Sequence, residues 1–139
     1  MAFGASSSWQ NLTLNLLRII AGFLFLQHGA QKLFGVFDGT QVDWLSFIGL
    51  AAVLEFFGGI LVLLGAFTRP VAFVLAGQMA VAYWMGHGKS FSPFEFASFW
   101  PVVNQGEKAV LYCFLFLLLW THGGGSLSLD ALLRKRKAA

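Results

Sequence analysis

The sequence predicts an all-α membrane protein, a four-transmembrane-helix bundle with a short interfacial helix between the third and fourth spans. Hydrophobic residues make up 58% of the 139-residue chain and charged residues only 11%, whereas a soluble domain is about 45–50% apolar and about 25% charged. The mean hydropathy is +0.73. This composition excludes an ordinary soluble globule, an intrinsically disordered chain and a basic nucleic-acid-binding module. We expect one domain, residues 1–139, with lipid as its main solvent.

Four apolar stretches are long enough to be membrane spans, because a crossing helix needs about 20 largely apolar residues. Pro70 stands in the first turn of the third stretch, where a helix tolerates proline. Asn104 and Glu107 have the spacing of a capping box ahead of the fourth. The first stretch has no evident cleavage site, so we predict a retained span rather than a signal peptide. The spans are predicted at about residues 12–34, 42–67, 70–87 and 107–121.

The connection between the third and fourth predicted spans is rich in aromatic residues. Ser92 and Glu95 repeat the capping-box spacing, with Pro93 at the first helical position. The remaining ten or so residues are too few to cross a bilayer, which takes about 20. We therefore predict a short helix in the membrane interface at about residues 93–100, ended by Pro101.

An even number of spans places both termini on the same side of the membrane. Residues 126–139 form a basic tail, and Arg69 in the second loop adds a further cation to that side. The opposite loops carry three cations, Lys32, Lys89 and Lys108. Since cytoplasmic loops carry the excess of Lys and Arg, the charges predict that both termini are cytoplasmic.

Charged side chains inside the predicted spans are the most informative residues. A charge at the centre of a span costs about 2.5–3.5 kcal/mol on insertion scales, so it usually faces the bundle interior or a cavity. Arg18 lies about 9 Å and Glu55 about 16 Å from the same side at 1.5 Å per residue. We predict that they form a buried ion pair. The alternative is that Arg18 extends to the lipid headgroups.

A second set of polar residues is predicted near the outer ends of the spans. Arg18, His28 and Lys32 fall within an arc of about 80° on one helix. His28, Lys32, His87 and Glu107, with Gln78 deeper, can line a polar cavity that opens to the outer leaflet. Structural alternatives remain open. His28 can be a hydrogen-bonded structural residue, His87 can have an interfacial role at its helix end, and Glu107 can merely cap its helix.

No cofactor is evident in the sequence. Cys113 is the sole cysteine, which excludes an intrachain disulfide and a thiolate metal cluster. His28 and His87 can in principle be axial haem ligands, but no other residue supports a haem. The clustered His and carboxylate ligands of a zinc or di-iron site are missing, as are nucleotide-binding and catalytic-triad motifs.

The order and spacing of several short motifs resemble the DoxX family over nearly the whole chain. In the first span they are Arg18, Gly22, Phe25, His28-Gly29 and Lys32-Leu33-Phe34-Gly35. Later in the chain they are Glu55 with Gly58-Gly59, residues 104–107, and Ser128-Leu129-Asp130. Gln105 departs from the pattern, because the family usually has glycine there.

The resemblance implies a small four-helix protein of the bacterial inner membrane with a link to redox work. One family branch resembles a subunit of a thiosulfate:quinone oxidoreductase, and another is associated with membrane complexes that handle thiols and oxidative stress. We therefore expect a redox-associated subunit that uses a quinone as substrate and receives electrons from a protein partner. Candidate proton-handling residues are His28, Glu55 and Glu107, and candidate cavity-lining residues are Arg18, Lys32, Gln78 and His87.

Two other functions remain open at the level of sequence. The chain can be a non-enzymatic scaffold or assembly factor in which the polar residues only specify the bundle. It can also be a carrier of a small molecule, although four spans without an inverted repeat would then have to form a homo-oligomer.

Overall fold

The structure is a computed structural model that describes residues 8–87 and 99–138. All regular elements in these two ranges are helices, which confirms the predicted all-α class. Two of them, α1 and α2, are long and apolar enough to cross a membrane. The elements are α1 (Ser8–Phe34), α2 (Phe47–Leu64), α3 (Thr68–Ala82) with the π-helical turn η1 (Tyr83–His87), α4 (Pro101–Asn104), α5 (Glu107–His122) and α6 (Leu129–Ala138).

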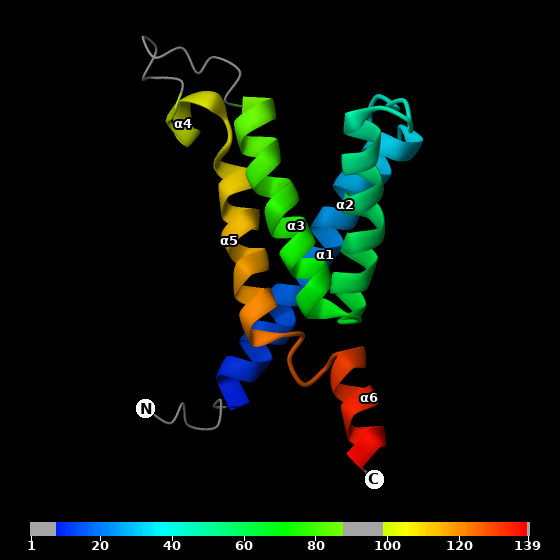
Figure 1. The fold of residues 1–139 in the computed structure, drawn as a ribbon, viewed down its shortest axis with the longest axis vertical. Helices are drawn as coiled ribbons and strands as arrows, with labels where there is room; N and C mark the ends of the chain where they lie inside the picture. The colour runs from blue at the N-terminus through cyan, green and yellow to red at the C-terminus, as the bar shows by residue number, and fades with distance from the viewer. Residues whose placement is uncertain (1–7, 88–98, 139) are drawn as a thin grey trace.

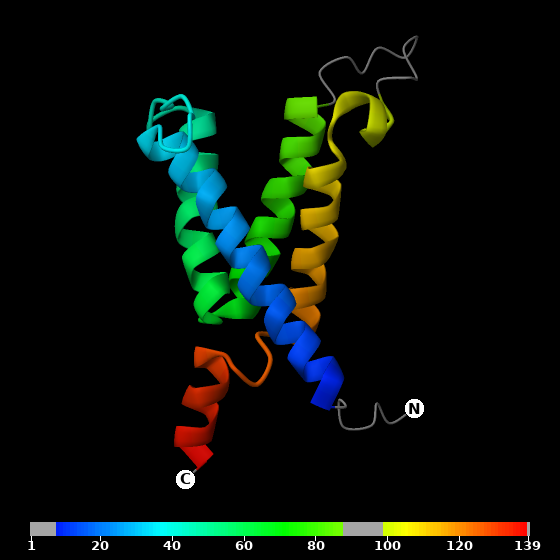
Figure 2. The same ribbon diagram turned by 180° about the vertical axis from the view of Figure 1, so that it is seen from behind.

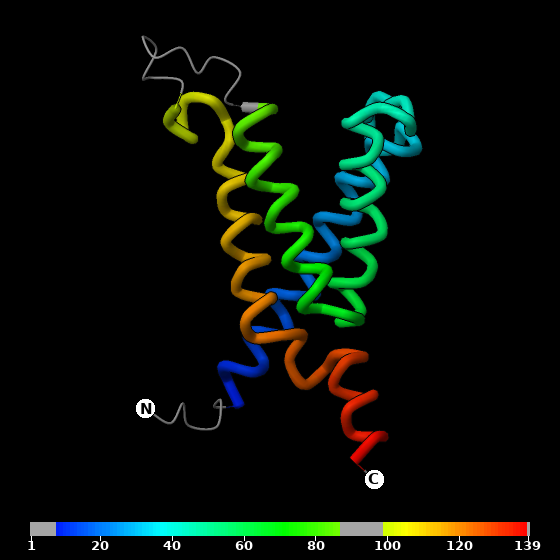
Figure 3. The backbone as a smooth tube through the Cα atoms, viewed as in Figure 1, coloured from blue at the N-terminus to red at the C-terminus, as the bar shows by residue number. Residues whose placement is uncertain are grey.

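The long helices form two pairs, α1 with α2 and α3 with α5. The pairs converge toward one end of the molecule and diverge toward the other, as the two opposite views show (Figures 1 and 2). The start of α1 and the helix α6 both lie at the converging end (Figure 3). We call this the α6 end, and the opposite end, which holds the 35–46 turn and α4, the α4 end.

Glycines allow α1 and α2 to pack backbone against backbone. A Cβ at Gly22 would overlap the backbone of Leu63, and a Cβ at Gly29 would overlap that of Phe56. Gly59 on α2 meets the backbone of α1 in the same way. In lipid, helices associate through close van der Waals packing, which small residues at the crossing permit. Glycine at these three positions is therefore what lets α1 and α2 approach so closely.

A small apolar core joins the four long helices. Each helix contributes buried side chains to it, among them Phe25 of α1, Val62 of α2, Leu75 of α3 and Phe116 of α5. The rings of Phe25 and Phe116 meet edge to face, with centroids 4.9 Å apart. Most other large apolar side chains point away from the bundle. Such an extended apolar surface marks contact with a membrane or another protein.

The second helix is shorter than the predicted span 42–67 at both ends. Ser46 is its N-cap, and the Ser46 hydroxyl accepts a hydrogen bond from the Gly49 amide at 2.9 Å. At the other end Gly65 has a φ of +69°, a left-handed conformation that glycine adopts without strain. This turn allows α3 to begin as early as Thr68.

The segment before α5 differs from its prediction. The predicted interfacial helix, 93–100, lies outside the described residues up to position 98. Pro101 does not end a helix but occupies the start of α4. Asn104 does not cap α5, because its side-chain oxygen accepts from the Gly106 amide at 2.8 Å and Gly106 itself is the N-cap. Within the predicted tail, 126–139, the helix α6 runs from Leu129 to Ala138.

We expect Gly29→Ala to destabilise the protein by about 1–3 kcal/mol, the usual cost of overpacking a tight contact. The matched control is Gly77→Ala on α3, where an added Cβ meets no atom within 4 Å. That control should be neutral or slightly stabilising, because alanine is the better helix former. Thermal unfolding in detergent measures both. Equal melting temperatures for the two variants would contradict the close approach of α1 and α2.

Candidate functional site

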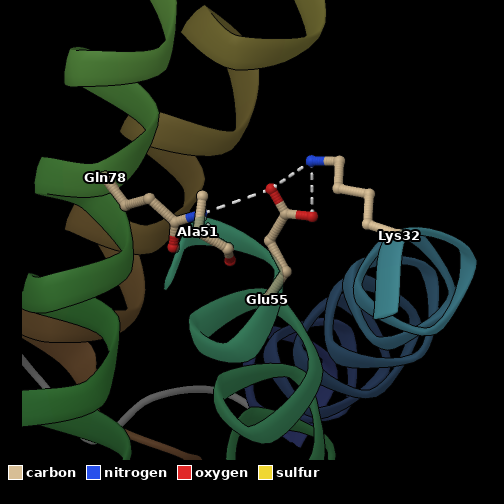
Figure 4. A network of polar contacts seen from close by, with 4 residues as sticks. All are labelled: Lys32, Ala51, Glu55 and Gln78. Atoms are coloured by element: carbon tan, nitrogen blue, oxygen red, sulfur yellow. Dashed lines mark hydrogen bonds and ion pairs between the residues drawn. The ribbon is translucent and has the colours of Figure 1, made fainter. Parts of the chain in front are cut away.

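Side chains from three helices converge on Glu55, near the middle of α2 (Figure 4). The Lys32 ammonium lies 2.7 Å from each Glu55 carboxylate oxygen. The Gln78 amide nitrogen donates to Glu55 Oε1 at 3.2 Å and to the Ala51 carbonyl at 3.1 Å. We call Lys32, Glu55 and Gln78 the polar cluster. It connects α1, α2 and α3.

The ion pair in the polar cluster is exposed on one side only. The Glu55 side chain is 5% exposed, whereas that of Lys32 is 36% exposed. Charge-assisted hydrogen bonds of this length are among the strongest in proteins. A buried carboxylate needs such a partner, because removal from water costs several kcal/mol per ion. Lys32 supplies the partner and also connects the cluster to the surface.

The orientation of the Gln78 amide follows from its neighbours. Both nearby groups, the Ala51 carbonyl and Glu55 Oε1, are acceptors, so the NH₂ end must face them. The Gln78 carbonyl oxygen is then buried and, among the described residues, receives no hydrogen bond. A buried acceptor without a donor is unfavourable by about 1–3 kcal/mol. The cluster therefore has an unused acceptor.

A groove between α2 and α3 runs alongside this acceptor. Its volume is about 230 Å³, and Gln78 is the one polar residue in a wall of otherwise apolar side chains. Pockets for drug-sized ligands begin at about 300 Å³. The groove is thus suited to a single apolar ring or a lipid chain.

Arg18 forms a separate network toward the α6 end. Arg18 is 1% exposed. It donates to the carbonyls of Gly124, Val62 and Leu127 at 2.8 Å each, and also to that of Leu63. The α2 carbonyls lie in the last turn of that helix, where carbonyls lack intrahelical donors and a cation is favourable. Arg18 therefore joins α1, the end of α2 and the connection between α5 and α6.

Asp130 supplies a cap to a helix that cannot cap itself. Phe67, the N-cap of α3, makes no side-chain cap hydrogen bond. The Asp130 carboxylate accepts from the Phe67 and Thr68 amides at 2.8 Å each. Burial raises the pKa of Asp130, but the hydrogen bonds from Thr68 and Phe67, with the nearby charge of Arg134, outweigh it and lower the pKa below its usual value. This carboxylate fastens α6 to the start of α3.

The sequence of the chain is similar to a family model and to known proteins. Residues 13–88 match the model of the DoxX family. The chain belongs to the DoxX family. A protein of Haemophilus influenzae is 38% identical, with 84% of this chain and 87% of that protein covered. Inner membrane protein YphA of Escherichia coli is 33% identical, with 92% of this chain and 93% of YphA covered.

A further relative is named a membrane protein. It is an uncharacterized membrane protein of Mycobacterium tuberculosis, 30% identical, with 97% of this chain and 94% of that protein covered. No solved structure matches the chain. Family membership and the membrane relatives identify this DoxX chain as an integral membrane protein.

The predicted ion pair between Arg18 and Glu55 is wrong. The end of α2 and the loop after α5 offer Arg18 four carbonyl acceptors, and Lys32 reaches Glu55 instead. His28 and Glu107 are exposed rather than facing inward. Neither forms a hydrogen bond or ion pair with the polar cluster.

The predicted role of His87 stays untested. His87 ends η1, but its side chain lies outside the described part of the structure. Its predicted place in the cavity, and its pairing with His28 on a haem, therefore stay predictions. In residues 8–87 and 99–138, no three His, Cys, Asp or Glu side chains gather as a metal site requires.

The roles of Asp130 and Ser128 were missed by the sequence reasoning. The Ser128 hydroxyl accepts from the Ala131 amide at 3.2 Å and donates to the Gly125 carbonyl at 2.7 Å, so it starts α6. A serine ahead of a helical segment is a recognisable cap signal. The contact of Asp130 with α3 spans more than 60 positions in the chain, and no local pattern indicates it.

We expect Asp130→Asn to lower the free energy of unfolding by about 1 kcal/mol at neutral pH, the typical value of an N-cap. The pKa of Asp130 is lower in the folded chain, so its contribution is present above the unfolded-state pKa of about 3.9 and is lost as pH falls through the folded-state value. The wild type should therefore lose more stability on acidification than the variant.

Urea unfolding in detergent across this pH range measures the effect. Asp38→Asn is the matched control, because Asp38 is exposed and accepts no side-chain hydrogen bond in the described residues. Parallel pH profiles for the wild type and Asp130→Asn would show that the cap is not formed in solution.

Proposed function

We propose that the chain crosses the bacterial inner membrane four times, with both termini in the cytoplasm. The third span would be α3 continued by η1, from Thr68 to His87, and the fourth α5, of 16 residues. At 1.5 Å per residue α5 is about 24 Å long, enough for most of the hydrocarbon core. Both helices present large apolar side chains outward, among them Phe73, Val74, Leu111 and Phe114.

The distribution of basic residues and the position of the two termini support the proposed cytoplasmic orientation of the α6 end. The start of α1 and the basic helix α6 share one end of the bundle, as an even number of crossings requires (Figure 1). Arg69 lies at this end as well, at the start of α3. The positive-inside tendency then assigns the α6 end to the cytoplasm. YphA of Escherichia coli, named an inner membrane protein, supports the same membrane.

Cysteine labelling tests this topology. In a Cys113→Ser background, Thr40→Cys lies in the turn at the α4 end and Lys135→Cys lies on α6; both positions are exposed. A membrane-impermeant maleimide should label Thr40→Cys in intact spheroplasts and Lys135→Cys only after lysis. Labelling of both before lysis, or of Lys135→Cys alone, would refute the orientation.

We infer further that the protein is a quinone-linked redox subunit that binds a quinol or quinone at the polar cluster. The free acceptor of Gln78 beside an apolar groove is the observation that carries this inference. A quinol combines an apolar ring with hydroxyl donors, and its hydroxyl would satisfy Gln78 once the amide turns toward the groove. Lys32 keeps a third ammonium proton that the two bonds to Glu55 do not use.

Quinone reduction needs a source of electrons and a path for protons. Reduction of a quinone to a quinol takes up two electrons and two protons. The electrons would come from a partner protein, and the protons would pass through Lys32, which is half-exposed, and Glu55. A fixed cation beside a quinone oxygen also stabilises the negative charge that develops there. His28 and Glu107, which are exposed, take no part in this scheme.

Quinol binding by purified protein tests the inference. We expect a short-chain quinol to quench tryptophan fluorescence on binding, and Gln78→Leu to weaken binding about tenfold, as loss of one hydrogen bond at about 1–1.5 kcal/mol predicts. Gln31→Leu is the control, because Gln31 is bonded to the Phe37 carbonyl outside the groove. No quinol binding by the wild type, or equal loss in both variants, would count against the site.

A scaffold function is the second candidate, and one observation favours it. The polar cluster joins three helices, so its charges can serve only to fix their arrangement. In that case Gln78→Leu should lower the melting temperature or change the oligomer size, while quinol binding stays absent in every variant.

A further inference from the structure

A second cavity lies at the α6 end, and none of the residues that line it belongs to the polar cluster. Its volume is about 360 Å³, and it is bounded by the start of α3, the end of α5 and one side of α6. Figure 1 shows α6 beyond the end of the bundle, beside the junction of α2 and α3. This cavity and the polar cluster are thus two separate sites.

The cavity is cationic. Arg69, Arg134 and Lys137 line it, and within the described residues none of them forms an ion pair. The carboxylate of Asp130 also lines it, but both Asp130 oxygens already accept amide hydrogen bonds from the start of α3. Three cations against one carboxylate leave a net charge of +2 with His122 neutral. An anion in this cavity would be held by side chains rather than by the α3 amides.

Apolar side chains form the rest of the wall. Phe67 is 69% exposed and Leu133 is 55% exposed, and both border the cavity together with Pro70. Phe67 stands at the junction of α2 and α3, where the bundle would leave the bilayer. Along α6, leucines precede a run of four basic residues, a composition suited to the membrane interface. The cavity therefore combines positively charged side chains with an apolar wall, at the level where lipid headgroups would lie.

We propose that this cavity binds the phosphate headgroup of an anionic phospholipid. Basic pockets between helices at the membrane surface recognise such headgroups. Arg69 and Lys137 hold the phosphate from two sides, and the acyl chains leave along Phe67 and Leu133. A free phosphate ion would use the cations but not the apolar wall. The proposal rests on membrane insertion of the chain and not on quinol binding.

Native mass spectrometry of the full-length protein in a mild detergent tests the proposal. Wild-type protein should retain phosphatidylglycerol at least tenfold more tightly than phosphatidylcholine. Arg69→Gln/Lys137→Gln should lower retention of phosphatidylglycerol on the order of tenfold or more, since each surface cation contributes several-fold to attraction of an anionic lipid. Lys137→Gln alone provides a milder variant that keeps the fold if the double variant is unstable.

The matched control is Lys135→Gln/Arg136→Gln, which removes the same charge from positions of α6 that do not line the cavity. This control should retain phosphatidylglycerol as the wild type does. Equal loss in the two double variants would reduce the effect to general charge attraction and overturn the site. Displacement of the lipid by inorganic phosphate at equal concentration would reassign the cavity to free phosphate. A wild type without preference for phosphatidylglycerol would also overturn the proposal.

Discussion

A buried arginine that is satisfied by backbone carbonyls holds the α6 end together. Arg18 contacts the last turn of α2 and the loop that follows α5. A cation in a low-dielectric interior has to be surrounded by oppositely directed dipoles or by an anion. Here the dipoles are fixed parts of two segments, the last turn of α2 and the loop after α5, so removing either would leave the charge without part of its acceptors. The convergence of the two helix pairs at this end follows from that constraint.

The use of carbonyls by Arg18 has a consequence for Glu55. Because the guanidinium needs no carboxylate, Glu55 is free to pair with Lys32 toward the α4 end. The two charged networks are thus separated along the bundle axis. One consists of a cation with neutral acceptors and has no titratable partner close to neutral pH. The other contains a carboxylate, an ammonium and an amide that are joined by hydrogen bonds.

Sequence reasoning predicted the helical class and the presence of buried charge, but it mispaired the charges. The depth estimate for Arg18 and Glu55 ignored the carbonyls at the end of α2, which are acceptors independent of side-chain identity. The angular estimate was also too coarse. At about 100° per residue His28 lies about 80° from Arg18, just beyond the buried face, whereas Lys32 lies about 40° away and stays within reach of α2.

The two members of the ion pair in the polar cluster are unevenly exposed. A pair that served only to fix helices would be most stable if both charges were shielded equally and every neighbour were satisfied. Lys32 is instead 36% exposed against 5% for Glu55, and the Gln78 oxygen beside them receives no donor from the described residues. An accessible cation, a buried base and an unused acceptor, next to an apolar groove, form an incomplete hydrogen-bond network. The quinol proposed above, with its hydroxyl donors, would complete this network.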